Sequence, residues 1–229
     1  MKQCAAWRKQ FPLRYAKKGG LRAQHVLDRL DKLGGRDCIL TTDVGQHQMW
    51  AAQFCLTTKP HHWLSSGGAG TMGFGMPAAI GAQFGCPDKK VWAIVGDGGV
   101  QMTMAELATA AVHKLPIKVL IINNGFLGMI RQWQDLFYDQ RFTAAALEGN
   151  PDFVKLAAAY GIKGWRIRRA GDVDRVLKAA MAYNDGPCVV DAEVMHQENV
   201  FPMIPAGASL REMLIERPRH KMDKPVGST

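Results

Sequence analysis

The sequence lacks the cysteine spacings and the long apolar runs that mark secreted, metal-cluster or membrane proteins. Its five cysteines are scattered and never form a CxxC pair, which argues against an iron–sulfur cluster, a zinc ribbon or a disulfide framework. No stretch approaches the roughly 18 apolar residues of a spanning helix, and the N-terminus has no apolar signal segment. We therefore expect a soluble, cytoplasmic protein that makes no membrane contact.

Acidic residues are scarce only near the N-terminus, so the net charge of +9 is unevenly distributed. Residues 1–36 hold ten Lys and Arg against two Asp, a balance of +8, which leaves +1 for the remaining 193 residues. Nucleic-acid binding would need a basic stripe interleaved with aromatic residues or a known binding motif, and the sequence has neither. We expect no nucleic-acid partner.

The chain divides into three segments by composition. Residues 1–20 are basic, contain Pro12 and end in a Gly-Gly pair, so we interpret them as a linker or arm. Residues 21–194 carry the regular apolar patterns of one folded domain. Residues 195–229 contain four prolines and are interpreted as a C-terminal tail, with a short helix near 210–215.

Extended and helical patterns alternate along the central segment. Strands are expected at 38–43, 62–66, 91–95, 118–122, 164–168 and 187–194, and helices near 26–33, 46–55, 77–84, 103–114, 127–137, 151–160 and 172–183. The helix at 103–114 is expected to begin with a capping box of Thr103 and Glu106. Continuous apolar strands alternating with helices predict an α/β fold, a three-layer sandwich whose parallel sheet of about six strands has helices on both faces.

Two polar side chains directly follow apolar strands, and parallel sheets bind ligands at that edge. Asp97 and Asn124 stand 27 positions apart across one strand-helix-strand unit, so we expect them to face one crevice. Carboxylate and amide oxygens suit Mg²⁺, which usually completes its shell with water and phosphate oxygens. Gly96, Gly98 and Gly99 would let the backbone approach a diphosphate.

This spacing, GDG followed after about two dozen residues by NN, resembles the thiamine-diphosphate motif. A more specific resemblance covers nearly the whole chain. The segments TTDVGQHQMWAAQF (41–54), WLSSGGAGTMGFGMPAAIGAQ (63–83), GDGGVQMTMAELATA (96–110), NNGFLGMIRQWQDLFY (123–138) and ENVFPMIPAGA (198–208) are similar to the C-terminal domain of acetolactate (acetohydroxyacid) synthase catalytic subunits. The resemblance implies the thiamine-diphosphate-binding fold, with thiamine diphosphate and Mg²⁺ as cofactors.

The resemblance also implies roles for particular residues. Mg²⁺ would be held by the side chains of Asp97 and Asn124 and the carbonyl of Phe126. The cofactor would contact Val44, Gln46, His47, Gly70, Met72, Gly96, Gly98 and Gly99, with the Gly70 carbonyl on its exocyclic amine and Met72 between its rings. Met129 and Trp133 would shape the pocket for the second 2-oxo acid, pyruvate or 2-oxobutyrate. The implied reaction joins two 2-oxo acids with loss of CO₂, a transferase step in isoleucine and valine biosynthesis.

The resemblance does not extend to two other domains of this family. In the family, an activating glutamate comes from an N-terminal domain across a dimer interface, and a middle domain binds FAD. None of the six glutamates here lies in that domain's motif, so we assign no catalytic residue to this chain. We expect it to be inactive alone and to need the missing portion, as a homo- or hetero-oligomer.

Three other readings remain open at this stage. The chain could be the diphosphate-binding subunit of a two-chain 2-oxo acid decarboxylase or of a 2-oxo acid oxidoreductase, although many of the latter carry clustered cysteines. It could be a non-catalytic cofactor-binding fragment. The run Gly68-x-Gly70-x-x-Gly73 also fits a dinucleotide-binding loop, but its preceding strand is short and no acidic residue follows where a ribose contact would lie.

Overall fold

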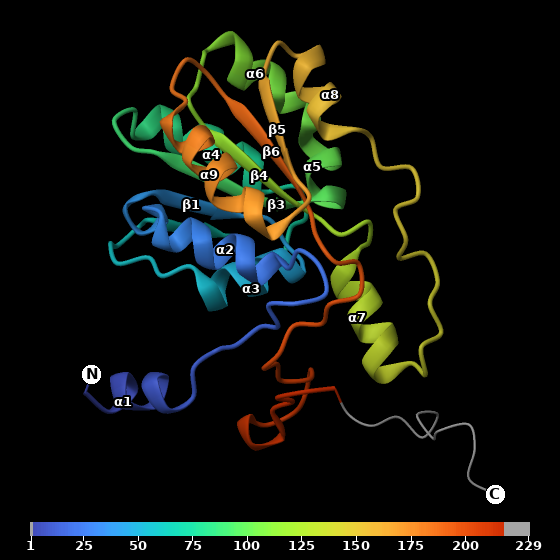
Figure 1. Ribbon diagram of the computed structural model, residues 1–229. Helices are drawn as coiled ribbons and strands as arrows, with labels where there is room; N and C mark the ends of the chain where they lie inside the picture. The colour runs from blue at the N-terminus through green and yellow to red at the C-terminus, as the bar shows by residue number, and fades with distance from the viewer. Residues whose placement is uncertain (1, 218–229) are drawn as a thin grey trace, which may run out of the picture.

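The structure, a computed structural model, describes residues 2–217 and is built around one parallel sheet (Figure 1). Its six strands lie in the order β2-β1-β3-β4-β6-β5, and every neighbouring pair is parallel. The strands are β1 (Ile39–Thr42), β2 (Trp63–Ser65), β3 (Val91–Gly96), β4 (Lys118–Asn123), β5 (Lys163–Ile167) and β6 (Cys188–Glu193). The predicted parallel sheet of about six strands is confirmed.

Helices cover both faces of this sheet. In chain order the helices are α1 (Lys2–Gln10), α2 (Ala23–Lys32), α3 (Gln46–Phe54), α4 (Gly75–Gly85), α5 (Asp97–Thr103), α6 (Leu107–Val112), α7 (Gly128–Phe137), α8 (Phe153–Ala159) and α9 (Val173–Ala182). Two of them, α1 and α7, lie outside the layers that cover the sheet (Figure 1). Short 3₁₀ turns occupy Gly35–Asp37, Met104–Glu106, Ala170–Asp172 and Leu210–Glu212. None of the helices within residues 2–217 is both long and apolar enough to span a membrane.

The hydrophobic core has two parts, one on each face of the sheet. On one face, α2, α3 and α9 pack against alternate strand residues such as Trp92 and Ile94. On the other, α4, α5, α6 and α8 pack against the intervening residues, such as Ala93 and Val95. Every residue of β3 is buried, as expected for a strand covered on both faces. These two cores produce the three-layer α/β sandwich.

The path of the chain through the sheet creates one crevice. After β1 the chain moves outward to β2, and it then crosses back to place β3 on the other side of β1. The connections that follow β1 and β3 therefore diverge at their carboxyl ends. Ligands of open α/β sheets bind at such a switch point.

One local prediction is wrong, and one helix was not predicted. The unpredicted helix, α5, follows β3 directly and ends at Thr103; the predicted helix then starts with the 3₁₀ turn Met104–Glu106 and continues as α6 (Leu107–Val112). The expected capping box does not form, because the hydroxyl of Thr103 donates to the carbonyl of Gly73, 3.1 Å away, in a segment distant in sequence. A tertiary hydrogen bond thus replaces the local one.

Within the N-terminal segment interpreted as a linker or arm, residues 2–10 form the helix α1. This segment has no proline or glycine and is rich in Lys, Gln, Ala and Arg, which are good helix formers. None of its residues is buried, and the helix lies away from the layered body (Figure 1).

Candidate functional site

A cavity of about 270 Å³ lies at the carboxyl ends of β1, β3 and β4. This volume is slightly below the ~300–1,000 Å³ typical of pockets that enclose a whole small molecule, so it suits one part of a larger ligand. The lining residues are Val44, Gly45, Gln46, His47, Trp50, Gly70, Met72, Gly96, Asp97, Gly98, Gly99, Ile122, Asn124, Phe126, Leu127, Met129 and Ile130. The structure therefore brings together twelve of the thirteen residues named from the sequence.

Asp97, the first residue of α5, presents a buried carboxylate to the cavity. Its Oδ2 accepts hydrogen bonds from the backbone N–H of Gly125 (2.9 Å) and from Asn150 Nδ2 (2.7 Å). Burial nevertheless raises the pKa of Asp97 to about 6, because too little positive charge compensates the lost water. A bound cation would supply that charge, so the carboxylate is suited to a metal ion.

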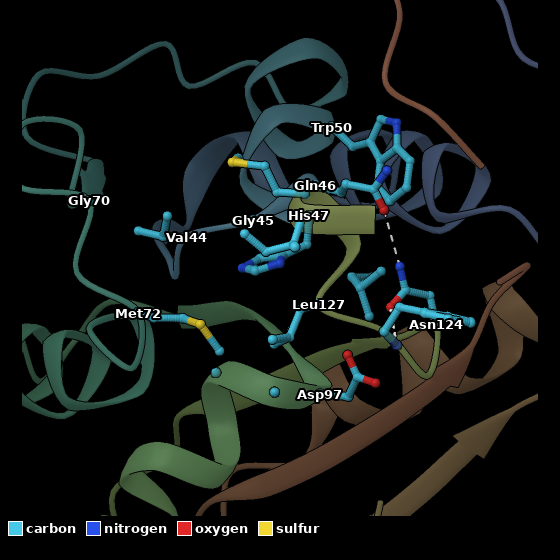
Figure 2. Close-up of a pocket in the computed structure, with 17 residues that line it drawn as sticks. Val44, Gly45, Gln46, His47, Trp50, Gly70, Met72, Asp97, Asn124 and Leu127 are labelled. Carbon is cyan, nitrogen blue, oxygen red and sulfur yellow. Dashed lines mark hydrogen bonds between the residues drawn. The ribbon is translucent and has the colours of Figure 1, made fainter. Parts of the chain in front are cut away.

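Asn124 follows β4, the neighbour of β3, and lies opposite Asp97 (Figure 2). Its Nδ2 donates to Gln46 Oε1 at 3.1 Å, which orients the amide, and its Oδ1 accepts from the N–H of Phe126 at 3.1 Å. Gly125 between them has a φ of +72°, a left-handed conformation that glycine adopts readily. Among residues 2–217, no group of three His, Cys, Asp or Glu side chains is placed to hold a metal ion. The carboxylate of Asp97 and the amide of Asn124 provide oxygen ligands of the kind that Mg²⁺ prefers.

His47, in the first turn of α3, is buried and neutral. Burial lowers its pKa to about 3. Its Nε2 has no hydrogen-bond partner among the described residues, although the atom is buried. The ring fits only between glycines, because a Cβ on Gly45 or Gly96 would come within 2.9 Å of it. An unpartnered imidazole nitrogen at this cavity is suited to an oxygen of a bound ligand.

The two glycines after Asp97 are required by close contacts. A Cβ on Gly99 would lie 1.7 Å from Asp43 Oδ2, so no side chain can be accommodated there. A Cβ on Gly98 would lie 2.9 Å from Leu127 and 3.1 Å from Met72. The apolar side chains of Leu127 and Met72 therefore close over the start of α5.

The glycine-rich segment before α4 reaches the same cavity. Gly70, with a φ of +65°, and Met72 both line it, and Val44 faces them from the end of β1 (Figure 2). Asp43 holds this segment in place, because its Oδ1 accepts hydrogen bonds from the N–H groups of Val44 (2.8 Å) and Gly73 (2.6 Å). These apolar and backbone groups form one wall of the cavity.

Sequence reasoning missed Asp43, Trp50, Leu127 and Gln132. For Asp43 a signal existed, because it follows β1 directly, as Asp97 follows β3. Gln132 is fully buried, and its Oε1 accepts from Gln46 Nε2 (2.8 Å) and from the N–H of Val200 (2.7 Å). No spacing rule links these residues, which meet only in the folded chain.

The two residues expected to shape a substrate pocket are separated. Met129 lines the cavity, whereas Trp133 lies outside it in a groove with Ile130, Tyr138 and Arg141. Trp133 packs edge-on against Phe137, with ring centroids 5.3 Å apart. Ile130 borders both hollows and therefore connects them along α7.

Comparison with known proteins gives consistent matches. Residues 43–192 match the family model described as "Thiamine pyrophosphate enzyme, C-terminal TPP binding domain". An acetolactate synthase of Mycobacterium bovis is 49% identical over 92% of this chain and 35% of its own length. The acetolactate synthase large subunit of Porphyra purpurea is 47% identical over 91% of this chain and 35% of its own length. The chain thus spans about a third of the curated relatives it matches.

Proposed function

This chain belongs to the thiamine pyrophosphate enzymes through its C-terminal TPP-binding domain, and from that premise we propose that its cavity binds Mg²⁺ and the diphosphate of thiamine diphosphate. The observation that carries the proposal is the meeting of Asp97 and Asn124, from adjacent strand ends, at one cavity that also contains the unpartnered Nε2 of His47. Hard oxygen ligands beside a buried nitrogen suit a cation paired with phosphate oxygens.

In this proposal, different residues of the cavity contact Mg²⁺, the diphosphate and the rings of thiamine diphosphate. Asp97, Asn124 and the carbonyl of Phe126 hold Mg²⁺. The diphosphate contacts Gln46, His47, Gly96, Gly98 and Gly99, and the rings lie against Val44, Met72 and the carbonyl of Gly70. When bound, thiamine diphosphate supplies an electron sink for the carbanion that remains after a 2-oxo acid loses CO₂.

The apolar wall has its own role in this reaction. Val44, Met72 and Leu127 line the cavity and exclude water from the reacting end of the ligand. Met129 and, from the adjoining groove, Trp133 select the second 2-oxo acid. We propose that the product is acetolactate or its 2-oxobutyrate homologue, precursors of valine and isoleucine, as in the acetolactate synthases it resembles.

We propose that the activating carboxylate of the complete reaction comes from a pyrimidine-binding portion or chain, and that the working assembly is a dimer or larger oligomer. All five cysteines are free thiols, which supports a reducing compartment such as the cytoplasm.

Isothermal titration calorimetry with thiamine diphosphate and Mg²⁺ tests cofactor binding. We expect Asp97→Ala to weaken binding more than tenfold, a loss above about 1.4 kcal/mol, because one cation ligand is removed. Asp185→Ala, which removes an exposed carboxylate, should bind like the unmodified chain. Equal affinity of all three proteins, or preferential binding of NAD, would contradict the proposal.

A complementation assay tests the synthase activity separately. The chain is mixed with a polypeptide that supplies the pyrimidine-binding portion, and acetolactate is measured after adding pyruvate. We expect product only when both polypeptides and thiamine diphosphate are present. Release of CO₂ and aldehyde without acetolactate would favour the decarboxylase alternative, and cofactor binding without turnover would favour a non-catalytic role.

A further inference from the structure

The Asp97 carboxylate accepts a hydrogen bond from a residue that does not line the cavity. Asn150 lies in the segment before α8, and its Nδ2 donates to Asp97 Oδ2 at 2.7 Å. The N–H of Gly125 donates to the same oxygen at 2.9 Å. Two donors on one oxygen fix the rotation of the carboxylate and hence the direction in which it faces a cation.

Asn150 is itself held in one orientation. Its Oδ1 accepts from Gln101 Nε2 at 2.9 Å, and the same Nε2 donates to the carbonyl of Asp97 at 3.0 Å. Asp97 and Gln101 are one turn apart on α5, so the three residues close a ring. A flipped Asn150 amide would place its oxygen against the Asp97 carboxylate, and this ring prevents that arrangement.

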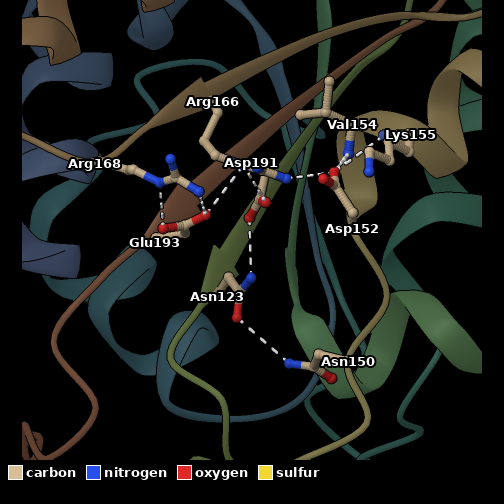
Figure 3. Close-up of polar contacts among 9 residues, drawn as sticks. All are labelled: Asn123, Asn150, Asp152, Val154, Lys155, Arg166, Arg168, Asp191 and Glu193. Carbon is tan, nitrogen blue, oxygen red and sulfur yellow. Dashed lines mark hydrogen bonds and ion pairs between the residues drawn. The ribbon is translucent and has the colours of Figure 1, made fainter.

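Asn150 also reaches the second strand of the site. Its Nδ2 lies 3.4 Å from the Oδ1 of Asn123, the last residue of β4, which immediately precedes Asn124. Asn123 Nδ2 in turn donates to the buried carboxylate of Asp191 on β6 at 3.1 Å (Figure 3). The Asn150 amide thus contacts the carboxyl ends of both β3 and β4, the strands that precede the proposed cation ligands.

The far end of this network is anchored in the sheet (Figure 3). Arg166 on β5 lies 3.2 Å from Asp191 and 3.1 Å from Glu193, and it also pairs with Asp152. Asp152 caps α8 and stands two residues after Asn150. The ion pair between Asp152 and Arg166, on the edge strand β5, therefore holds the segment that carries Asn150 in place.

We propose that Asn150 is a positioning residue for the cation site: it orients the Asp97 carboxylate and holds the ends of β3 and β4 at the spacing the ion requires. The inference rests on the function proposed above. Groups that orient metal ligands typically affect metal affinity by roughly 10–100-fold when removed. Asn150 acts through Asp97 and Asn123 and touches neither cation nor diphosphate.

The test uses Mn²⁺ as the probe, with electron paramagnetic resonance titrations in saturating thiamine diphosphate. We expect Asn150→Ala to weaken Mn²⁺ binding roughly 10–100-fold and to change the spectrum of the bound ion at saturation. Gln101→Met removes the hydrogen bond to Asn150 Oδ1 but keeps the Asn150 amide. The loss of Mn²⁺ affinity should therefore be smaller than for Asn150→Ala. Asn184→Ala, at an exposed asparagine whose amide donates only to the nearby carbonyl of Ala182, should match the unmodified chain.

The outcomes separate the two proposals. If the unmodified chain binds no Mn²⁺ with thiamine diphosphate, the proposed function fails and this inference fails with it. If the unmodified chain binds and Asp97→Ala does not, while Asn150→Ala keeps full affinity, only the positioning role is overturned. Weaker binding with an unchanged saturated spectrum would also overturn it, because lost stability alone leaves ligand geometry intact. Gln101→Met supplies the same readout should Asn150→Ala fail to fold.

Discussion

At the scale of single residues, the site depends on polar groups that are buried before any ligand arrives. His47 shows this most clearly, because its ring is enclosed, its Nε2 is unpartnered and its pKa falls to about 3. Asp97 is shifted in the opposite sense, with a pKa raised to about 6 by burial. Burial thus favours the neutral form of each side chain over its charged form. Keeping either side chain charged in the cavity lowers the stability of the folded state, and a bound ligand of opposite charge offsets this loss.

The shift at His47 predicts a pH-dependent stability. An unfolded histidine takes up a proton near pH 6.5, whereas folded His47 does so only near pH 3, so acid favours the unfolded state. The contribution of His47 to stability is therefore full above pH 6.5 and is lost as the pH falls through the window from 6.5 to about 3. We compare the free energy of unfolding of the unmodified chain with that of His47→Gln. As the pH decreases, the unmodified chain should lose stability relative to His47→Gln by about 1.4 kcal/mol per pH unit in the middle of this window.

Urea unfolding at pH values from 4 to 8 measures this difference. The opposite contribution of Asp97 is common to both proteins and cancels. His61→Gln, at an exposed histidine, serves as the matched control substitution. A His47→Gln difference that does not vary with pH would refute the buried neutral imidazole.

At the scale of elements, local signals work where the partner lies within a few residues. Asp152 caps α8, accepting hydrogen bonds from the N–H groups of Val154 (3.0 Å) and Lys155 (3.1 Å). The Thr103 signal is equally good in sequence, yet its hydroxyl bonds to Gly73 instead. Capping spacings are thus reliable only when no distant acceptor competes for the side chain.

The two functions of Asp152 can be separated by substitution. Asp152→Asn keeps a capping oxygen but loses the charge paired with Arg166, whereas Asp152→Ala loses both. The ion pair is partly exposed and is worth at most about 1 kcal/mol, and the cap adds about 1 kcal/mol. Urea denaturation should rank the proteins as unmodified, then Asn, then Ala, with about 1 kcal/mol between the last two. Equal destabilisation by Asn and Ala would show that the cap contributes nothing.

At the scale of the whole molecule, the layered body is distinct from the N-terminal arm. Tyr15 is the first described residue of the arm that is not exposed; its hydroxyl donates to Asp28 at 3.0 Å and its ring packs edge-on against Phe54. Burial and the neighbouring Asp28 raise the pKa of Tyr15 to about 12. Before this residue, α1 buries none of its side chains.

Two deletions test this boundary. Removing residues 2–13 should change the free energy of unfolding by less than about 0.5 kcal/mol, because only exposed groups are lost. Removing residues 2–18 also takes away Tyr15 and should cost about 1–3 kcal/mol, the usual range when a part-buried, hydrogen-bonded side chain is lost. Urea denaturation of both variants gives the comparison. A large loss from the shorter deletion would contradict the exposed arm.

The sequence by itself determined the α/β class, nearly all the elements, and the pair Asp97 and Asn124. Those features depend on periodicity and turn chemistry within short windows, and on a strand-helix-strand unit whose strands turn out to be adjacent. The Thr103 cap was predicted wrongly, because a tertiary acceptor takes its hydroxyl, and the helix α1 in the N-terminal arm was not predicted.

Only the tertiary structure decided the switch point between β1 and β3, the contact of Asp43 with Gly99, and the bracing of Asp97 by Asn150, 53 residues away. It also placed Trp133 in a separate groove, although Met129 lies four residues before it on α7. The physical reason is that hydrophobic patterns set which residues are buried but not the order of the strands, and that order determines which distant side chains meet.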